Sequence, residues 1–314
     1  MEMFRLLFLL LFFVNFLEAT SAETEDIINS VNIATINTLL IFTSQDGLNS
    51  GVYHFTNTPQ EIDMTIYHLP FMYNFKSDTN FNFFVVGNVG YSRVELKGEI
   101  ETISTTEPTL DFFNHIQTYT AGIGGGVRYK FKKDIFLLVG GELIYSRAGL
   151  SIIKPDGDLG DIIEDFFNKN YSDNISYKFF TQAEYRPIIN EFKPYVSLDY
   201  KLYETKSTFT FNDLAGFRSA SSVTSLKLGV ETPKLFEYNE HNNLTLEAYL
   251  NGHYLSGVVR DMTNVKTYRS LGGVAYWNTS ASPSWASRFF LELNRVNGDG
   301  LNGYNVGVGF TLDF

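Results

Sequence analysis

Charged residues recur at every second position in several stretches of this chain, and that spacing limits the chemistry they could do. Arg128 and Lys130 are two positions apart, as are Glu184 and Arg186. Residues two apart on an extended strand share one face. Such a face could line a polar cavity or a water-filled channel, or its acids and bases could pair and brace each other. Thirteen residues belong to this predicted polar face: Arg128, Lys130, Glu142, Lys178, Glu184, Arg186, Asp199, Lys201, Lys227, Glu231, Glu247, Arg288 and Glu292.

A histidine that activates a nearby serine is the pairing most expected of a hydrolytic enzyme. His253 and Ser256 come closest to such a pair. Three positions apart on a strand, however, they point to opposite faces and cannot cooperate. The other histidines, which have no serine or aspartate at a spacing typical of barrel proteases, are His54, His68, His115 and His241. We therefore expect no catalytic residues and no enzyme activity.

The stretch Asp156–Asp161 (DGDLGD) superficially resembles a calcium-binding loop. Its aspartates are not in the required order, and the twelfth position is Phe167 where such loops have glutamate. Asp161 followed by Glu164 is better interpreted as the start of a short helix. We expect no metal site and no cofactor.

The elements that position the polar face are strands. Apolar and polar residues alternate in run after run, which is the period-two pattern of a half-buried strand. The clear runs are Asn80–Tyr91, His115–Phe131, Ile135–Tyr145, Tyr177–Arg186, Pro194–Leu202, Leu226–Glu231, Leu244–Asn251, Phe289–Asn294 and Gly303–Phe314. Weaker runs are Val31–Ser44, Ile62–Phe75 and Tyr268–Trp277. Together they predict about twelve strands, since each is near the length that a tilted membrane strand needs.

The last run is the most regular. An apolar face of Tyr304, Val306, Val308, Phe310, Leu312 and Phe314 backs a small, polar one. The order polar, x, Gly, x, x, aromatic, x, hydrophobic resembles the C-terminal assembly signal of bacterial outer-membrane barrels. The residues that carry it are Asn305, Gly307, Phe310, Leu312 and Phe314. The resemblance implies two partners: the lipid of the outer membrane, and the barrel-assembly machinery, which would recognise this strand.

The connections between runs alternate in length. Short ones are Lys76–Thr79, Lys132–Asp134, Pro187–Glu191 and Asn278–Trp285, with Phe236–Asn242 slightly longer. Long ones are Gln45–Glu61, Glu95–Asn114, Ala148–Asn174, Thr205–Ser222, Gly257–Thr267 and Val296–Asn302. A soluble β-sandwich has similar strand spacing but not this alternation. The pattern predicts an all-β fold, a transmembrane antiparallel up-and-down β-barrel with short periplasmic turns and long extracellular loops.

The N-terminus predicts export. Arg5 precedes the apolar run Leu6–Leu17, and the small residues Thr20–Ala22 follow it, as in a cleaved signal peptide. We divide the chain into a signal peptide (1–22), a tail or short helix (23–30) and the barrel (31–314). Apolar residues from Ile27 to Ala34 are roughly helix-spaced, so this segment could enter the lumen as a plug or be an unstructured leader.

Composition further limits the class of function that the chain could have. The net charge of −11 argues against a nucleic-acid surface, and the aromatic content of 16% suits lipid-facing girdles. The polar face holds acids and bases in similar number, which predicts a narrow pore or transporter for small polar solutes. The alternative is a barrel with a plugged lumen and a structural or surface-adhesion role. That architecture is similar to an autotransporter-type β-domain standing alone without a passenger.

Overall fold

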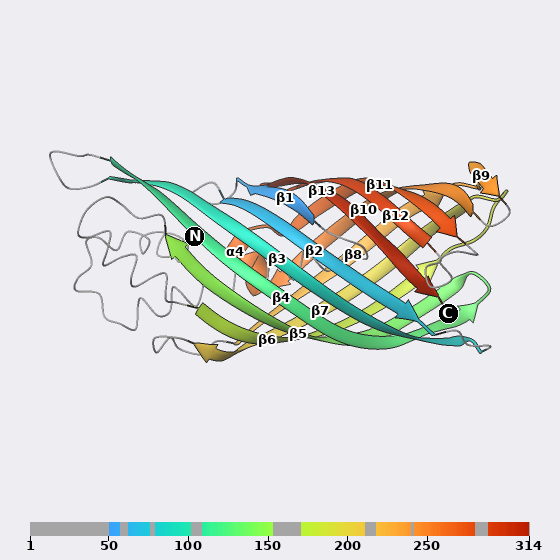
Figure 1. The fold of residues 1–314 in the computed structure, drawn as a ribbon, viewed down its shortest axis with the longest axis horizontal. Coiled ribbons are helices and arrows are strands. Elements are labelled where there is room, and N and C mark those ends of the chain that lie inside the picture. The colour runs from blue at the N-terminus through green and yellow to red at the C-terminus, as the bar shows by residue number, and fades with distance from the viewer. Residues whose placement is uncertain are drawn as a thin grey trace.

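The computed structural model describes residues 50–56, 62–75, 79–101, 109–152, 171–210, 218–239, 242–279 and 288–313. Nearly all of them lie in strands (Figure 1). In chain order the elements are β1 (Ser50–Phe55), β2 (Ile62–Asn74), β3 (Phe81–Glu101), β4 (Thr109–Lys132), β5 (Ile135–Ile152), β6 (Tyr171–Tyr185), β7 (Lys193–Thr210), β8 (Arg218–Glu231), β9 (Phe236–Asn239), β10 (Asn242–Gly257), α4 (Val258–Thr263), β11 (Thr267–Thr279), β12 (Arg288–Gly298) and β13 (Leu301–Asp313). Within these ranges, no helix is long and apolar enough to cross a membrane.

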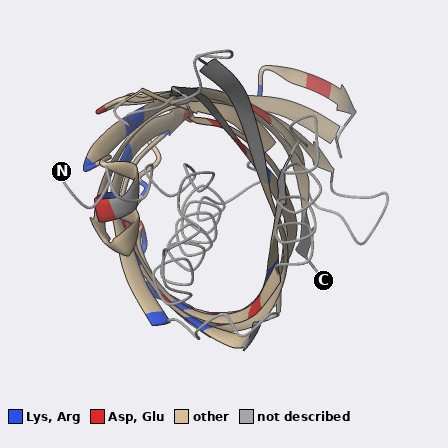
Figure 2. Cartoon of the chain, turned by 90° about the vertical axis from the view of Figure 1, so that its left-hand side faces the viewer, with Lys and Arg blue, Asp and Glu red and all other residues tan. Residues whose placement is uncertain are grey.

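The sheet closes on itself. Each strand pairs with its neighbours along the chain, and β1 pairs antiparallel with both β2 and β13. β9 is the exception, because it pairs only with β10, at Asn242–Leu244 beyond the end of the β8–β10 pairing. The other twelve strands form a closed antiparallel barrel, seen end-on in Figure 2. The predicted all-β barrel of about twelve strands is confirmed.

The two ends of the barrel differ in their connections. At one end, which we call the turn end, residues 133–134 join β4 to β5 and β13 finishes. At the other, the loop end, α4 joins β10 to β11 and residues 153–170 connect β5 to β6. β3 and β4, with 21 and 24 residues, extend furthest toward the loop end (Figure 1). A tilted strand crosses a bilayer with about 9–11 residues, so these two have length to spare.

The wall has one apolar face and one mixed face. On β10, Leu246 and Leu250 are exposed, whereas Glu247, Tyr249 and Asn251 between and beside them are buried. The same alternation places exposed leucine, isoleucine, valine, phenylalanine or tyrosine side chains on the outside of each of the twelve barrel strands. An exposed apolar exterior around a buried polar interior is the inverse of a soluble protein and is stable only in lipid.

The barrel closes through its shortest wall strand. β1 has six residues, and its first, Ser50, lies opposite Val306. β13 continues past that point and pairs in parallel with β2, Leu312 opposite Tyr73. The wall at the turn end is therefore closed by a parallel contact between strands that are otherwise separated by β1.

The identity of the first strand was predicted wrongly. β1 lies inside Gln45–Glu61, which we expected to be a connection, and the expected strand Val31–Ser44 lies outside the described residues. Val52 on the outer face is 57% exposed, while Tyr53 and Phe55 on the inner face are buried. The inner face carries the apolar Tyr53 and Phe55, whereas the outer face carries Ser50, Val52 and His54, so the segment lacks the apolar-outward alternation of the other strands.

Two expected long connections are also shorter than predicted. Val296–Asn302 is reduced to a two-residue turn between β12 and β13, with Gly300 at a φ of 68° that favours glycine. Much of Glu95–Asn114 is strand, because β3 runs to Glu101 and β4 begins at Thr109. The charged residues Glu95, Lys97, Glu99 and Glu101 interrupt the apolar alternation from which strands were predicted.

Candidate functional site: the lumen of the barrel

Five acidic residues predicted for the polar face are buried on the inner wall: Glu142, Glu184, Glu231, Glu247 and Glu292. Each contacts a basic, amide or hydroxyl side chain from another strand. A buried carboxylate without such partners would be costly. The buried acids of the inner wall are therefore grouped in paired polar clusters, nearer the turn end than the loop end.

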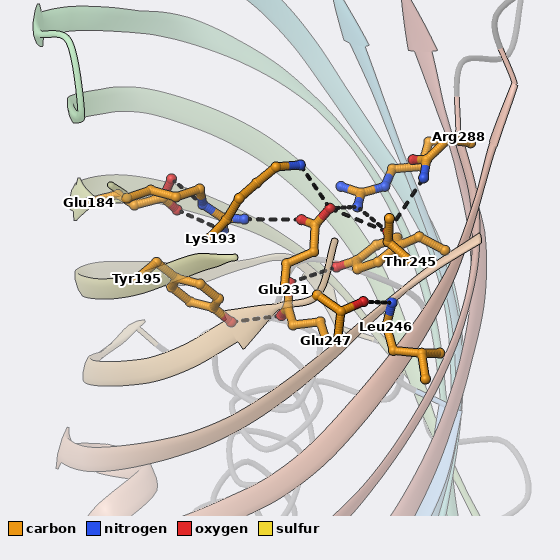
Figure 3. Close-up of polar contacts among 12 residues, drawn as sticks. Glu184, Lys193, Tyr195, Glu231, Thr245, Leu246, Glu247 and Arg288 are labelled. Atoms are coloured by element: carbon orange, nitrogen blue, oxygen red, sulfur yellow. Dashed lines mark hydrogen bonds and ion pairs between the residues drawn. The ribbon is translucent and has the colours of Figure 1, made fainter. Parts of the chain in front are cut away.

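The first cluster surrounds Glu231, at the end of β8 (Figure 3). Its carboxylate lies 2.8 Å from Arg288 Nη2, 3.1 Å from Lys193 Nζ and 3.5 Å from Arg186 Nη1. Thr245 donates a fourth contact at 3.3 Å. We call these five residues the Glu231 cluster. They come from β7, β8, β10, β12 and the end of β6, so one acid ties together five segments of the wall.

The second cluster is built from tyrosines. Tyr195 donates its hydroxyl hydrogen to Glu247 at 2.6 Å, and Tyr276 donates to the other oxygen at 3.2 Å. Lys227 lies 3.2 Å from the same carboxylate and 4.0 Å from the ring centroid of Tyr249. These contacts combine charge-assisted hydrogen bonds with a cation–π contact, so the lysine charge is neutralised on two sides.

Tyr249 extends this lining toward β12. Its hydroxyl group contacts Glu292, and Asn294 donates to the hydroxyl oxygen at 2.9 Å. The ring crosses Gly272 on the intervening strand: a Cβ there would lie 2.4 Å from Tyr249 Cζ. Gly229 has the same relation to Tyr195, at 2.6 Å. Glycine on the middle strand lets an aromatic side chain lie flat and reach the next strand but one.

The remaining pairs line the β3–β6 side of the lumen. Lys178 lies 3.1 Å from Glu142, which also accepts a hydrogen bond from Asn88. Glu184 is 3.1 Å from Arg186 and 3.5 Å from Arg128. Through Arg186, this group is continuous with the Glu231 cluster. Acidic and basic side chains of the polar face thus pair with each other across strands. This is the bracing interpretation of that face.

Three predicted residues stand apart from these clusters. Lys130 is exposed at the turn end and forms no ion pair with a described residue. Asp199 accepts a hydrogen bond from Ser197 at 2.6 Å. Lys201 is half-buried, and both residues line the inner cavity described below. The acid and the lysine contribute to a polar surface rather than to one of the tight clusters.

Two cavities lie along this part of the lumen. An inner one of about 180 Å³ is lined by residues including Asp199, Lys201 and His253. A wider one of about 950 Å³ lies at the turn end beside Lys193 and Arg288. The inner cavity has room for about six water molecules. Arg186 of the Glu231 cluster lines the inner cavity and the other four members line the wider one, so the cluster lies where the two cavities adjoin.

Toward the loop end the inner wall carries a large apolar cluster among buried serine, threonine and asparagine side chains. A cluster of sixteen buried side chains has 0–7% exposure: Tyr53, Phe55, Met64, Ile66, Val94, Ile116, Ile144, Ala148, Tyr203, Val223, Leu255, Val259, Val265, Tyr268, Val296 and Leu301. Val259 belongs to α4, whose backbone is held by a hydrogen bond from Val259 N to Ser221 Oγ at 3.2 Å. The chain after β10 therefore folds inward into the lumen.

His253 and Ser256 lie on opposite faces, as their spacing predicts. His253 is buried, with Ser225 Oγ 2.9 Å from Nδ1 and Ser270 Oγ 3.3 Å from Nε2, and it stacks on Tyr268 at 4.2 Å. Ser256 instead forms a 2.7 Å hydrogen bond with Ser222. The pair cannot act together.

The expected assembly strand is β13. Asn305 is buried and donates to Tyr53 OH at 2.9 Å across the β1–β13 contact. Gly307 also faces inward, whereas Phe310 faces out and is 39% exposed. Leu312 takes part in the parallel pairing with β2. Phe314 lies outside the described residues, as do the Asp156–Asp161 stretch and its expected helix.

Four side chains of the polar clusters were not predicted from the sequence: Lys193, Tyr195, Tyr249 and Tyr276. Tyr195 and Tyr249 share the inward parity of Ser197 and Glu247, so alternation could have found them. They were overlooked because tyrosine is also typical of the lipid-facing side. Within the described ranges, no group of three or more His, Cys, Asp or Glu could hold a metal ion.

The closed wall, apolar exterior and cross-paired polar interior define the class of fold, that of outer-membrane β-barrels. Among solved structures the chain is similar to three autotransporter β-domains. These are the transport unit of AIDA-I from Escherichia coli (TM-score 0.52, 11% identity, 90% of this chain and 98% of that one), the translocator domain of NalP from Neisseria meningitidis (0.51, 10%, 91% and 97%), and the β-domain of Bordetella BrkA (0.50, 10%, 83% and 95%). No family model matches the sequence, and no curated protein matches it. At such low identities the likeness is one of fold.

Proposed function

We propose that this protein is an autotransporter-like β-barrel of a bacterial outer membrane whose lumen is closed by a resident plug. The observation that carries the proposal is the cluster of sixteen apolar side chains on the inner wall, buried to 0–7% exposure. An open pore of this width would leave those side chains in water, at a cost of about 25 cal/mol for each Å² of apolar surface. A plug with an apolar face removes that cost.

The chain before Ser50 is the proposed plug. Its residues lead directly into β1, whose first described residue lies opposite Val306, partway along β13. They also carry the helix-spaced apolar residues Ile27, Ile28, Val31 and Ala34. An amphipathic segment with this spacing could present its apolar side to the inner wall. The assignment is supported by the match between the apolar cluster on the inner wall and the apolar side of the segment from Ile27 to Ala34.

Conductance in planar lipid bilayers tests the proposal. We expect the mature chain to give no stable channel, and a variant lacking residues 23–49 to open a large one. A full-length variant with Ile27→Asp and Ile28→Asp should open intermittently, because a charged face cannot stay against the apolar cluster. A stable ohmic channel from the mature chain would contradict the plug.

A narrow pore for small polar solutes is the second candidate. It is favoured by the inner cavity of about 180 Å³ and the wide cavity at the turn end, which meet at the Glu231 cluster. The same recording separates the two: a pore predicts steady conductance that rises in Glu231→Ala, where the carboxylate at the junction of the two cavities is removed. Vesicle swelling in neutral sugars would then set the size limit.

We also infer that β13 is recognised by the barrel-assembly machinery and that the role of the protein is not catalytic. The first rests on Asn305, Gly307, Phe310 and Leu312 in an intact terminal strand; the second rests on His253 being packed between two serines and a tyrosine. Deleting Phe314 should reduce insertion into the outer membrane, scored by heat-dependent gel mobility. Undiminished insertion would sink the first inference, and measurable lipase or protease turnover the second.

A further inference from the structure

A group of basic side chains lies on the outside of the barrel at its loop end. Arg269 is on β11 and Arg295 on β12, and Lys266 lies between α4 and β11; all three are exposed. In the β11–β12 register, Arg269 is opposite Asn297 and Arg295 is opposite Leu271. The two arginines are therefore diagonal neighbours about 7–8 Å apart at Cα. One ligand can reach both.

Aromatic rings flank the basic side chains. Arg295 lies 5.5 Å from the ring centroid of Tyr304, and Lys266 lies 6.0 Å from that of Tyr254. We call Tyr254, Lys266, Arg269, Arg295 and Tyr304 the rim patch. It covers neighbouring strands from β10 to β13.

The arginines of the rim patch differ from other outward arginines toward the loop end. Three others each have an acidic partner: Arg93 with Glu95 at 3.0 Å, Arg147 with Asp173 at 2.7 Å, and Arg218 with Glu204 at 3.0 Å. Arg269, Arg295 and Lys266 have no ion pair with any residue that the structure describes. Three positive charges thus lie on one small surface without an ion pair among the described residues; the nearby Asp299 accepts a hydrogen bond from Thr267 Oγ1 at 3.0 Å.

The rim patch borders the lipid-facing band. Immediately toward the turn end lie Leu271, Leu293 and Val306, which are 66%, 57% and 49% exposed. On β10 the exposed apolar side chains run from Leu246 to Tyr254, roughly 20 Å of height for a strand of this tilt. An outward arginine is costly near the bilayer midplane and nearly free at the interface. The rim patch accordingly belongs at the level of lipid headgroups.

We propose that the rim patch binds the phosphate group of a phosphorylated lipid in the outer leaflet. The guanidinium groups of Arg269 and Arg295 donate hydrogen bonds to the phosphate oxygens, and Lys266 adds a third positive charge. The acyl chains lie along the apolar band below, which is why the ligand is a lipid and not a free anion. The two tyrosines lie at the boundary between headgroup and chain, where such side chains are most stable.

The experiment uses the full chain, which has no cysteine. A single Asn297→Cys substitution beside Arg269 carries a donor dye, and the protein is reconstituted in phosphatidylcholine vesicles. Energy transfer to an acceptor-labelled, diphosphorylated glycolipid reports enrichment at the patch. We expect enrichment over the dephosphorylated glycolipid, and a loss of roughly tenfold or more in relative affinity in Arg269→Gln/Arg295→Gln, as for loss of charge-assisted contacts.

The matched control is Arg147→Gln/Arg218→Gln, which removes two outward arginines that already have acidic partners. It should leave the enrichment unchanged. Equal enrichment in wild type and Arg269→Gln/Arg295→Gln, or an equal loss in the control, would overturn the proposal. Displacement of the lipid by millimolar inorganic phosphate would overturn the choice of a lipid ligand. If the double variant fails to insert, Arg295→Gln alone is compared with Arg295→Lys, which is expected to retain the lipid.

Discussion

Replacing Gly272 with alanine is expected to lower the free energy of unfolding of the barrel, because the new Cβ displaces the ring of Tyr249. The new Cβ would lie 2.4 Å from Tyr249 Cζ, 2.5 Å from its hydroxyl oxygen and 2.7 Å from Asn294 Cβ. Ordinary contact begins at 3.4 Å, so the ring must retreat by about 1 Å. That movement breaks the contacts of Tyr249 with Glu292 and Asn294. Overpacking costs about 1–3 kcal/mol and each lost hydrogen bond about 0.5–1.5, so the total is about 2–6 kcal/mol.

The measurement is the free energy of unfolding in guanidinium chloride, for protein reconstituted in lipid vesicles. The adjacent Gly273→Ala is the matched control. A Cβ at Gly273 meets nothing closer than the carbonyl oxygen of Glu247 at 3.6 Å. Because alanine restricts the unfolded chain, this control should be neutral or stabilising by about 0.4–1 kcal/mol.

A double-mutant cycle tests the cause. In a Tyr249→Ala background there is no ring to displace, so Gly272→Ala should lose its destabilising effect. Equal effects of Gly272→Ala and Gly273→Ala would refute the reasoning. So would a penalty that persists in full after Tyr249 has been removed.

Three further predictions use the same unfolding measurement. Glu231→Gln leaves Arg186, Lys193 and Arg288 facing a neutral amide and should cost roughly 2–3 kcal/mol, less than for a fully buried pair because the cations are partly exposed; the exposed control Glu237→Gln should cost under about 0.5 kcal/mol, and equal losses would contradict the cluster. Val139→Arg places a charge on the lipid-facing side and should cost about 2–4 kcal/mol, whereas Gln182→Arg on the inner wall should be near neutral; the reverse order would mean that the faces are misassigned. Asn305→Ala removes a hydrogen bond across the β1–β13 contact and should cost about 1 kcal/mol, so an unchanged stability would show that the bond does not hold this closure.

Alternation alone was enough to predict the barrel and its two faces. The side chains of a strand alternate between two faces, so the apolar residues of each run by themselves indicate which face meets lipid and which faces the interior. This is why Glu142, Glu231, Glu247 and Glu292 could be assigned to one face without knowledge of any partner. The same pattern failed at Ser50–Phe55, where the inner face is apolar and the outer face is largely polar.

The partners within the lumen were decided by the tertiary structure. Tyr195 reaches Glu247 from 52 positions away, across the intervening β8, and does so only because Gly229 leaves room for the ring. The choice between a braced interior and an open channel has the same origin, since it depends on which charges face each other around a closed wall. The sequence by itself determined which residues face inward, because that is a local property of an extended chain. Which of them meet depends on strand order, register and closure, and these are properties of the whole sheet.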